Sequence, residues 1–277
     1  MTHRLASFLV RALPVACAIG IATTAAGPAG ISHGDDGPQS YPYSCNQDSL
    51  TADFATRDAM PQTQVPPAQW YQTNADGHYI NQGWGPAADA LPAPEIPADA
   101  GCDAATWKRE RILAVAMRYI NNPDNPLGLQ YRHHHIPAWN PTTSTYAGAP
   151  AENPDVDAAD TAIEWAAGPG LDCSNFTAWV YNYGLGIKFR GDVHQQYAGT
   201  AGPMGQAIPR EGPFQPGDLL FLHPDGSPNE VSHVVIFMDD QHIIDSRVNA
   251  QNLVGIQIRN REGWYRTAVL SAYRPIG

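Results

Sequence analysis

The sequence predicts an α+β domain in which about five antiparallel strands pack against two or three helices. Apolar residues recur at helical spacing in two stretches, residues 103–121 and 173–184. Short β-rich segments, separated by turn residues, follow toward the C-terminus. We expect strands at 219–222, 232–238, 242–246, 255–259 and 269–274. The chain is long enough for one such core at residues 103–277 and an N-terminal extension.

Residues 1–26 have the composition of a secretory signal peptide. Arg4 and Arg11 lie near the front, an apolar run follows, and small residues end it. A lipoprotein signal ending at Cys17 is the alternative, but Pro14 fits it poorly. We therefore expect a secreted protein, periplasmic or associated with the cell wall, with no membrane contact after the signal is removed.

The mature chain is predicted to be strongly acidic. The sequence has 16 Lys and Arg against 27 Asp and Glu, and the signal holds two of the basic residues and none of the acidic ones. The mature net charge is then 14 − 27 = −13 with histidines neutral. Such a chain, without a basic stripe, argues against nucleic acid and anionic lipid surfaces as partners.

Residues 27–102 are rich in Pro, Gly, Ala, Asp and Gln, which rules out long regular elements. Aromatic residues such as Trp70 and Trp84 are too many for a pure linker, so we expect a loosely structured extension that packs on the following domain. A wall-binding module is the alternative, although no internal repeat supports it. Cys45 and Cys102 are expected to form a disulfide worth roughly 3–4 kcal/mol, the alternative being two buried free thiols.

The helix predicted from residue 103 to about 121 begins at Asp103, a favourable N-cap residue. Its core stripe contains Ile112, Val115, Ala116 and Tyr119, and the charged residues 108–111 are expected to face solvent. Residues 122–126 end it with two prolines. Between this helix and residue 173 we expect a short extra helix at 157–167 and a loop at 139–154.

Cys173 is placed at the first turn of the second long helix. Phe176, Trp179, Val180 and Tyr183 form one apolar stripe, and Gly184 is expected to end the helix. Unpaired N–H groups and the helix dipole converge on such a position and are expected to lower the thiol pKa. The same N–H groups, with Ser174 next to the cysteine, can hold an oxyanion. The alternative is a small buried cysteine without chemistry.

His233 and Asp245 are candidate partners of the thiol. His233 begins a predicted strand 60 residues after Cys173, and Asp245 lies on the next strand, 12 residues further on. A hairpin would bring the two side chains together, so that Asp245 orients the imidazole and stabilises its charged form. His242 is the alternative orienting residue.

Three motifs in this order, Leu171-Asp172-Cys173-Ser174, Pro216-Gly217-Asp218-Leu219 and Ser232-His233-Val234, resemble the NlpC family of papain-like cell-wall cysteine peptidases. The resemblance covers roughly the last 170 residues and implies a papain-like core. It also implies Cys173 as nucleophile, His233 as base, Asp245 at the third polar position, and Tyr131 on the oxyanion side of the cleft.

The sequence departs from the family pattern at three places. Asn175 replaces the usual glycine after Cys-Ser, and Asp245 stands where a histidine is commoner. His133, His134 and His135 replace the Trp-Gly-Gly expected soon after the tyrosine. We expect at least one of these histidines to line the cleft and to bind a carboxylate or carbonyl of the substrate. The alternatives are a surface loop and, less favoured, a metal site completed by Asp155, Asp157 or Asp160.

The resemblance implies a cysteine peptidase or amidase that hydrolyses amide bonds in peptidoglycan stem peptides or similar small peptides. With the predicted signal peptide, we expect a secreted protein, and we expect it to be a monomer. It requires no cofactor and no metal. Two other functions stay open: a non-catalytic wall-binding or interaction module on the same fold, and an acyltransferase of transglutaminase type. An intact set of Cys, His and acidic partner favours the enzyme, because a binding module has no use for all three.

Overall fold

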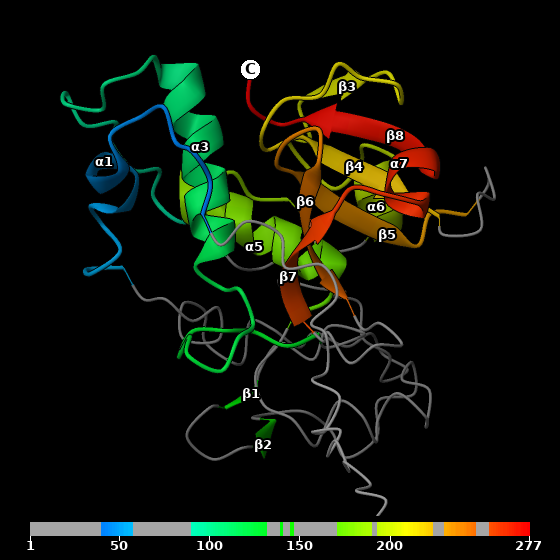
Figure 1. Ribbon diagram of the computed structural model, residues 1–277, viewed down its shortest axis with the longest axis horizontal. Helices are drawn as coiled ribbons and strands as arrows, with labels where there is room; N and C mark the ends of the chain where they lie inside the picture. The colour runs from blue at the N-terminus through cyan, green and yellow to red at the C-terminus, as the bar shows by residue number, and fades with distance from the viewer. Residues whose placement is uncertain are drawn as a thin grey trace, which may run out of the picture. The chain divides into compact units, whose positions relative to one another are not determined.

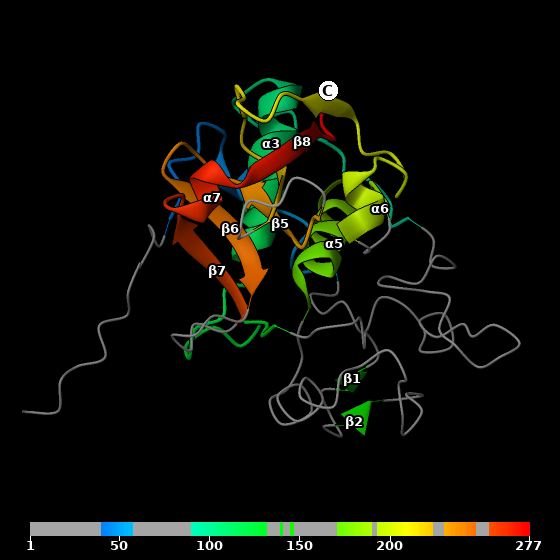
Figure 2. The same ribbon diagram turned by 90° about the vertical axis from the view of Figure 1, so that its right-hand side faces the viewer.

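A computed structural model describes residues 40–57, 90–131, 139–140, 145–146, 171–189, 193–223, 230–247 and 255–277 (Figures 1 and 2). These residues all belong to one compact unit, Asp35–Gly277. The predicted signal peptide, the predicted helix at 157–167 and His133, His134 and His135 lie outside the described residues. No helix in the described ranges is both long enough and apolar enough to cross a membrane.

The centre of the fold is a six-stranded antiparallel sheet with the order β3-β8-β4-β5-β6-β7. The five predicted strands are confirmed within one or two residues at each end. They are β4 (Leu219–Leu222), β5 (His233–Phe237), β6 (His242–Arg247), β7 (Gly255–Asn260) and β8 (Val269–Arg274). The sequence prediction missed β3 (Gln206–Ile208), a three-residue strand at the edge of the sheet that pairs with β8.

Two long helices cover one face of this sheet. The helix α3 (Ala104–Met117) packs against α5 (Cys173–Leu185), and α5 in turn contacts β5 and β6. Shorter helices are α1 (Gln47–Thr51) beside α3, α6 (Val193–Tyr197) beside α5, and α7 (Trp264–Thr267) before β8. The predicted loop at 139–154 is wrong in part, because β1 (Trp139–Asn140) and β2 (Thr145–Tyr146) pair within it.

Side chains alternate along the strands between two apolar clusters. Phe221, Val234 and Ile244 face the cluster formed with α3 and α5. Leu222, Val235 and Ile243 face a smaller cluster on the opposite side, which contains Tyr265 of α7. The sheet therefore has a helix-covered face and a second face over which α7 lies.

The sequence predicted that Gly184 ends the helix α5, but α5 continues to Leu185. Gly186 is the C-cap, with φ 67°, in the left-handed conformation that favours glycine. Gly184 instead lies inside the helix, where a Cβ atom would come within 3.0 Å of Ile112 Cδ1. Its missing side chain allows α3 and α5 to approach closely.

The segment Pro216-Gly217-Asp218 before β4 is held by a partly buried ion pair. Asp218 accepts hydrogen bonds from Arg274 of β8 at 2.7 and 2.9 Å and from the Gln215 N–H at 2.7 Å. Tyr181 of α5 donates its hydroxyl to the Gly217 carbonyl. The motif thus fixes the turn that leads into β4, and its role is structural.

In the predicted N-terminal extension, α1 packs against α3, and Leu91 donates its N–H to Asn182 of α5 at 2.8 Å. Glu110 accepts the N–H groups of Ser44 and Cys45 at 2.8 and 2.9 Å, and Arg111 binds Asp53 at 2.6 Å. Glu110 and Arg111 are 5% and 1% exposed, so the prediction that they face solvent is wrong. They are buried because the extension covers this side of α3.

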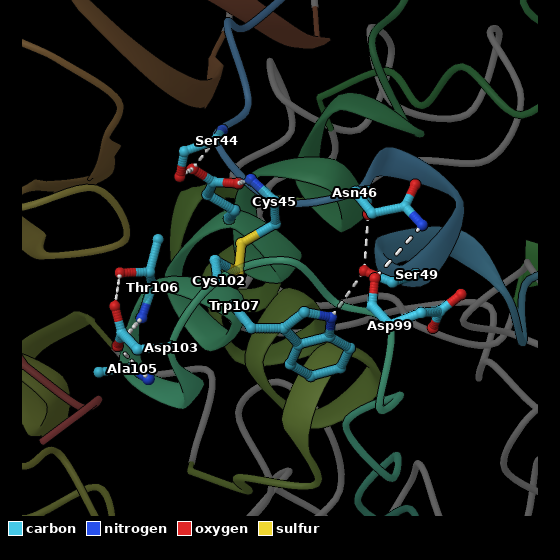
Figure 3. Close-up of a disulfide and its surroundings, with 11 residues drawn as sticks. Ser44, Cys45, Asn46, Ser49, Asp99, Cys102, Asp103, Ala105, Thr106 and Trp107 are labelled. Carbon is cyan, nitrogen blue, oxygen red and sulfur yellow. Dashed lines mark hydrogen bonds between the residues drawn. A yellow bond between two sulfur atoms is a disulfide. The ribbon is translucent and has the colours of Figure 1, made fainter.

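The disulfide between Cys45 and Cys102 is present, as predicted (Figure 3). It lies beside the N-terminus of α3, where Asp103 caps the Ala105 and Thr106 N–H groups at 3.0 Å. Trp107 donates its ring N–H to Ser49 on the other side of the bridge. The disulfide therefore fastens the start of the extension to the first turn of α3.

Removing the disulfide is expected to destabilise the protein. The cysteines are 57 residues apart, and closing a loop of that length in the unfolded chain corresponds to about 4 kcal/mol. The double variant Cys45→Ser, Cys102→Ser should lose about this much unfolding free energy in urea. Reduced wild-type protein is the control and should match the variant. An unchanged midpoint in both samples would contradict the prediction.

Candidate active site

The candidate nucleophile begins the central helix. Cys173 is the first residue of α5 and is 6% exposed. Asp172 caps the helix: its carboxylate accepts the Asn175 N–H at 2.7 Å and the Ser174 hydroxyl at 3.0 Å. The Asn175 side-chain amide binds the other carboxylate oxygen at 3.1 Å. The residue that replaces the family glycine thus strengthens the cap.

The N-terminus of α5 fits between two strands of the sheet. In the described residues, β5 and β6 pair only near the end of β5, where Ile236 lies opposite Ile244 and Phe237 opposite Ile243. Toward the start of β5 the described residues of the two strands are not paired. In this gap the Val234 N–H points at the Cys173 sulfur. Ser246 donates its hydroxyl to the Leu171 carbonyl at 2.6 Å. The opening of the two strands therefore places Cys173 beside the backbone that follows His233.

His233 and Asp245 are brought together as predicted from the chain order. The His233 Nε2 atom lies 2.7 Å from Asp245 Oδ2, and the two residues are 6% and 0% exposed. This bond uses one ring nitrogen, and Nδ1 is the atom left to exchange a proton with a thiol. His242, the alternative orienting residue, binds Asp239 at 2.9 Å instead.

Burial controls the protonation of the thiol. It raises the pKa of Cys173, and the negative charges of Asp172 and Asp245 add to the rise. The Val234 and Ser174 N–H groups oppose it without reversing it. The sequence-based expectation of a lowered pKa is therefore not met, because the helix terminus is enclosed. In the free protein Cys173 is a neutral thiol that needs a base to become a nucleophile.

Asp245 has the opposite behaviour. Burial alone would raise the pKa of its carboxyl, but the Arg259 guanidinium and the hydrogen bonds from His233 and Tyr265 outweigh burial. The net pKa lies well below its usual range. Asp245 is thus a fixed negative charge against the ring of His233, able to stabilise an imidazolium.

Tyr131 and Ser174 also lie at this end of the molecule. Gln130 accepts the Leu171 N–H at 3.0 Å, which places the half-buried Tyr131 next to the start of α5. The Ser174 hydroxyl is bound to Asp172, so the group that Ser174 presents to the thiol is its backbone N–H. The described ranges contain no group of three or more His, Cys, Asp or Glu placed to hold a metal ion.

Sequence reasoning missed three residues that surround the pair of His233 and Asp245. Arg259 binds Asp245 Oδ1 at 2.5 Å, and the Tyr265 hydroxyl donates to Asp245 Oδ2 at 2.7 Å. Trp264 meets the His233 ring edge-on, with centroids 5.8 Å apart. One of the three could have been found from the sequence. Arg259 lies on the opposite face of the strand 255–259 from Ile256 and Ile258, and a buried arginine on that face needs an acidic partner.

The pH dependence of stability tests the charge on Asp245. A carboxyl whose pKa is lower in the folded state stabilises the protein above its unfolded pKa of about 3.9 and loses this contribution as pH falls toward the folded value. Asp245→Asn should cost on the order of 3–5 kcal/mol near pH 7, since the buried Arg259 loses its carboxylate partner. The deficit, measured by urea unfolding, should shrink below about pH 4.

The control for this measurement is Asp239→Asn. It removes the charge of a carboxylate that binds His242 and is 38% exposed. It should change the unfolding free energy by about 1 kcal/mol or less. A deficit for Asp245→Asn that is the same at pH 3 and pH 7 would show that Asp245 is not held as a charge.

A cysteine at a helix N-terminus, a histidine at the start of a strand and an antiparallel sheet behind the helix define a papain-like α+β domain. Residues 160–272 match the model of the NlpC/P60 family. Members of the family are generally cysteine peptidases that act on peptidoglycan.

Several solved structures are similar to the chain. An NlpC/P60 family protein from Bacillus cereus ATCC 10987 is 28% identical over 39% of this chain and 32% of its own, with a TM-score of 0.32. The NlpC/p60 domain of the peptidoglycan hydrolase SagA is 26% identical over 38% and 77%, with a TM-score of 0.29. A variant of the Resuscitation Promoting Factor Interacting protein RipA is 17% identical over 82% of both chains, with a TM-score of 0.39.

The chain spans about a third of the Bacillus cereus protein. No curated protein sequence matches the chain.

Proposed function

We propose that the protein is a secreted cysteine peptidase or amidase that hydrolyses amide bonds in peptidoglycan stem peptides. The observation that carries the proposal is the buried pair of His233 and Asp245, 2.7 Å apart, beside Cys173 at the start of α5. The match of residues 160–272 to the NlpC/P60 family model supports the substrate class. The predicted signal peptide at 1–26 supports secretion.

In the proposed reaction His233 takes the proton of Cys173 as the sulfur attacks the carbonyl carbon of the scissile amide. The charge that develops on the carbonyl oxygen is stabilised by N–H groups at the first turn of α5, with Tyr131 on the same side. His233 then donates its proton to the amide nitrogen, the C–N bond breaks, and the free amine leaves a thioester acyl-enzyme on Cys173. Water, activated by His233, hydrolyses the thioester and restores the thiol.

The neutral resting thiol fits this sequence of steps. Because burial raises the pKa of Cys173, a thiolate forms only when the proton can move to a neighbouring base. Asp245 is ionised and bound to the distal nitrogen of His233, so it stabilises the imidazolium that results. We further propose that His133, His134 or His135 binds a carboxylate or carbonyl of the peptide, as the departure from the family motif suggests.

Digestion of purified peptidoglycan, followed by mass spectrometry of the released fragments, tests the proposed function. Secreted protein should shorten stem peptides and leave the glycan strands intact, with each cleaved amide gaining one water. Defined muropeptides should then identify the bond. Intact stem peptides after incubation with folded protein would reject the peptidase proposal in favour of a wall-binding module.

A further inference from the structure

The environment of Asp245 contains a cation that has no place in the proposed chemistry. Both carboxylate oxygens are bound, and their partners divide into two groups. Oδ1 receives the Nε–H of Arg259 at 2.5 Å, whereas Oδ2 is shared by His233 Nε2 and the Tyr265 hydroxyl, each at 2.7 Å. One oxygen thus faces the base, and the other is held by Arg259.

The sheet register explains why Arg259 reaches Asp245. In the pairing of β6 with β7, Asp245 lies opposite Gln257 and Ile243 lies opposite Arg259. Residues two apart on a strand point to the same face, so Arg259 and Asp245 are diagonal neighbours on one face. Arg259 is 6% exposed and also bonds the Gly255 carbonyl at 3.4 Å. Its charge is therefore confined beside Asp245.

A carboxylate that is 0% exposed stays ionised only if a charge partner replaces its lost hydration. In the proposed reaction His233 accepts a proton and then gives it up, so its charge is not a permanent partner for Asp245. A guanidinium remains protonated at all working pH values. The other charged or titratable groups that face Asp245 are His233, Tyr265, Cys173 and, through the Tyr265 hydroxyl at 3.3 Å, Arg247.

We propose that Arg259 is a positioning residue for catalysis, which keeps Asp245 ionised and directs its Oδ2 atom at His233 Nε2. Arg259 does not touch the reacting atoms, and its effect passes entirely through Asp245. The inference rests on the proposed function for its kinetic consequence, but the state of the pair of His233 and Asp245 exists in the free protein and can be measured there.

A double-mutant cycle tests whether Arg259 acts through Asp245. Arg259→Met keeps most of the side-chain volume without the charge, and Asp245→Asn keeps the shape without the charge. Each change is expected to lower kcat/KM on a muropeptide by about 10- to 100-fold, the loss typical of a hydrogen bond to a charged group. The double variant should lie within about threefold of Asp245→Asn, since Arg259 then has no charge to hold.

Losses that multiply in the double variant would overturn the proposal, because Arg259 would then act by a separate route. If Arg259→Met alone fails to fold, the double variant still decides, since its site contains no unpaired carboxylate. Arg259→Lys is the conservative variant to compare with Arg259→Met. It keeps the charge and should retain more activity than Arg259→Met. Equal activity of the Lys and Met variants would also count against the proposal.

The pH profile separates a positioning role from a structural one. Without Arg259, burial raises the pKa of Asp245, so its carboxylate is protonated as pH falls. The ratio of wild-type to Arg259→Met kcat/KM should be at least about fivefold larger at pH 5.5 than at pH 8. Arg274→Met is the matched control, because Arg274 forms a similar ion pair with Asp218 elsewhere in the sheet. It should lower stability and leave the ratio independent of pH.

A measurement without substrate distinguishes failure of this inference from failure of the proposed function. Nitrogen-15 NMR of the imidazoles should show the His233 Nε2 proton bound to a carboxylate from pH 5.5 to pH 8 in wild type and in Arg274→Met. In Arg259→Met the bonded signal should be lost at pH 5.5 and recover toward pH 8. If these spectra are found but no peptide is cleaved, the proposed function fails while the control of Asp245 by Arg259 stands. If the Arg259→Met spectrum is like that of wild type, the proposed role of Arg259 is wrong.

Discussion

Cys173→Ala should abolish peptide hydrolysis, with kcat reduced by about 10⁴- to 10⁶-fold, as expected when the nucleophile of a covalent mechanism is removed. No other thiol can replace it among the described residues, since Cys45 and Cys102 are bridged. The fold should survive, because the change removes one sulfur atom at the end of a helix whose cap, Asp172, is untouched. Stability should change by about 1 kcal/mol. Timed muropeptide digestion measures the loss.

Cys173→Ser is the matched control, since it keeps the size and hydrogen bonding of the side chain but replaces the thiol by a much poorer nucleophile. It should be nearly as inactive as the alanine variant, which separates loss of nucleophilicity from loss of packing. Both variants should still bind stem peptides in a direct binding assay. Turnover by Cys173→Ala at the wild-type rate would remove Cys173 from the mechanism.

The main elements of the fold could be predicted because each has a strong local pattern. Sequence periodicity reported the apolar stripe of α5 and the alternation of β7. In the structure every residue of α5 is buried, and residues on both faces of β7 are buried. The edge strand β3 carries no such pattern: two of its three residues are exposed, and only pairing with β8 makes it a strand. Its existence depends on a partner that lies more than 60 residues away along the chain.

The errors on α3 and α5 have one cause, which is packing by distant parts of the chain. Glu110 and Arg111 look like solvent-facing residues in the helix sequence, yet residues 44–53 cover them and bind both charges. Gly184 looks like a helix stop, yet it is the point where α3 approaches α5. Local sequence gives the propensity of a residue but not the neighbour that tertiary contact supplies.

The candidate site shows the same division. The order of Cys173, His233 and Asp245 along the chain was enough to predict that a hairpin pairs the last two, and they lie 2.7 Å apart. The direction of the thiol pKa could not be predicted, because the helix terminus is visible in the sequence and its enclosure is not. Arg259 was missed because its partner is fixed by the register of β6 and β7, which is a three-dimensional property.

His233→Ala should lower kcat/KM by about 10²- to 10⁴-fold, the range that a general acid–base residue contributes. The thiol loses the acceptor of its proton, and the leaving amine loses its donor. The fold should hold, because Asp245 keeps the bonds to Arg259 and Tyr265 after the imidazole is gone. His242→Ala is the control, since His242 binds Asp239, and it should stay within about twofold of wild type.

His233→Gln shows whether the imidazole acts as a base or only fills space. The glutamine amide can donate to Asp245 but cannot accept the proton of Cys173, so it should be as slow as the alanine variant. Because burial raises the pKa of Cys173, the residual rate of both variants should climb with pH up to at least about pH 9, where hydroxide begins to replace the missing base. Wild-type enzyme, which ionises the thiol through His233, should show no such climb. A glutamine variant with near-normal turnover and a flat profile would mean that another group accepts the proton, and the base would have to be sought elsewhere in the cleft.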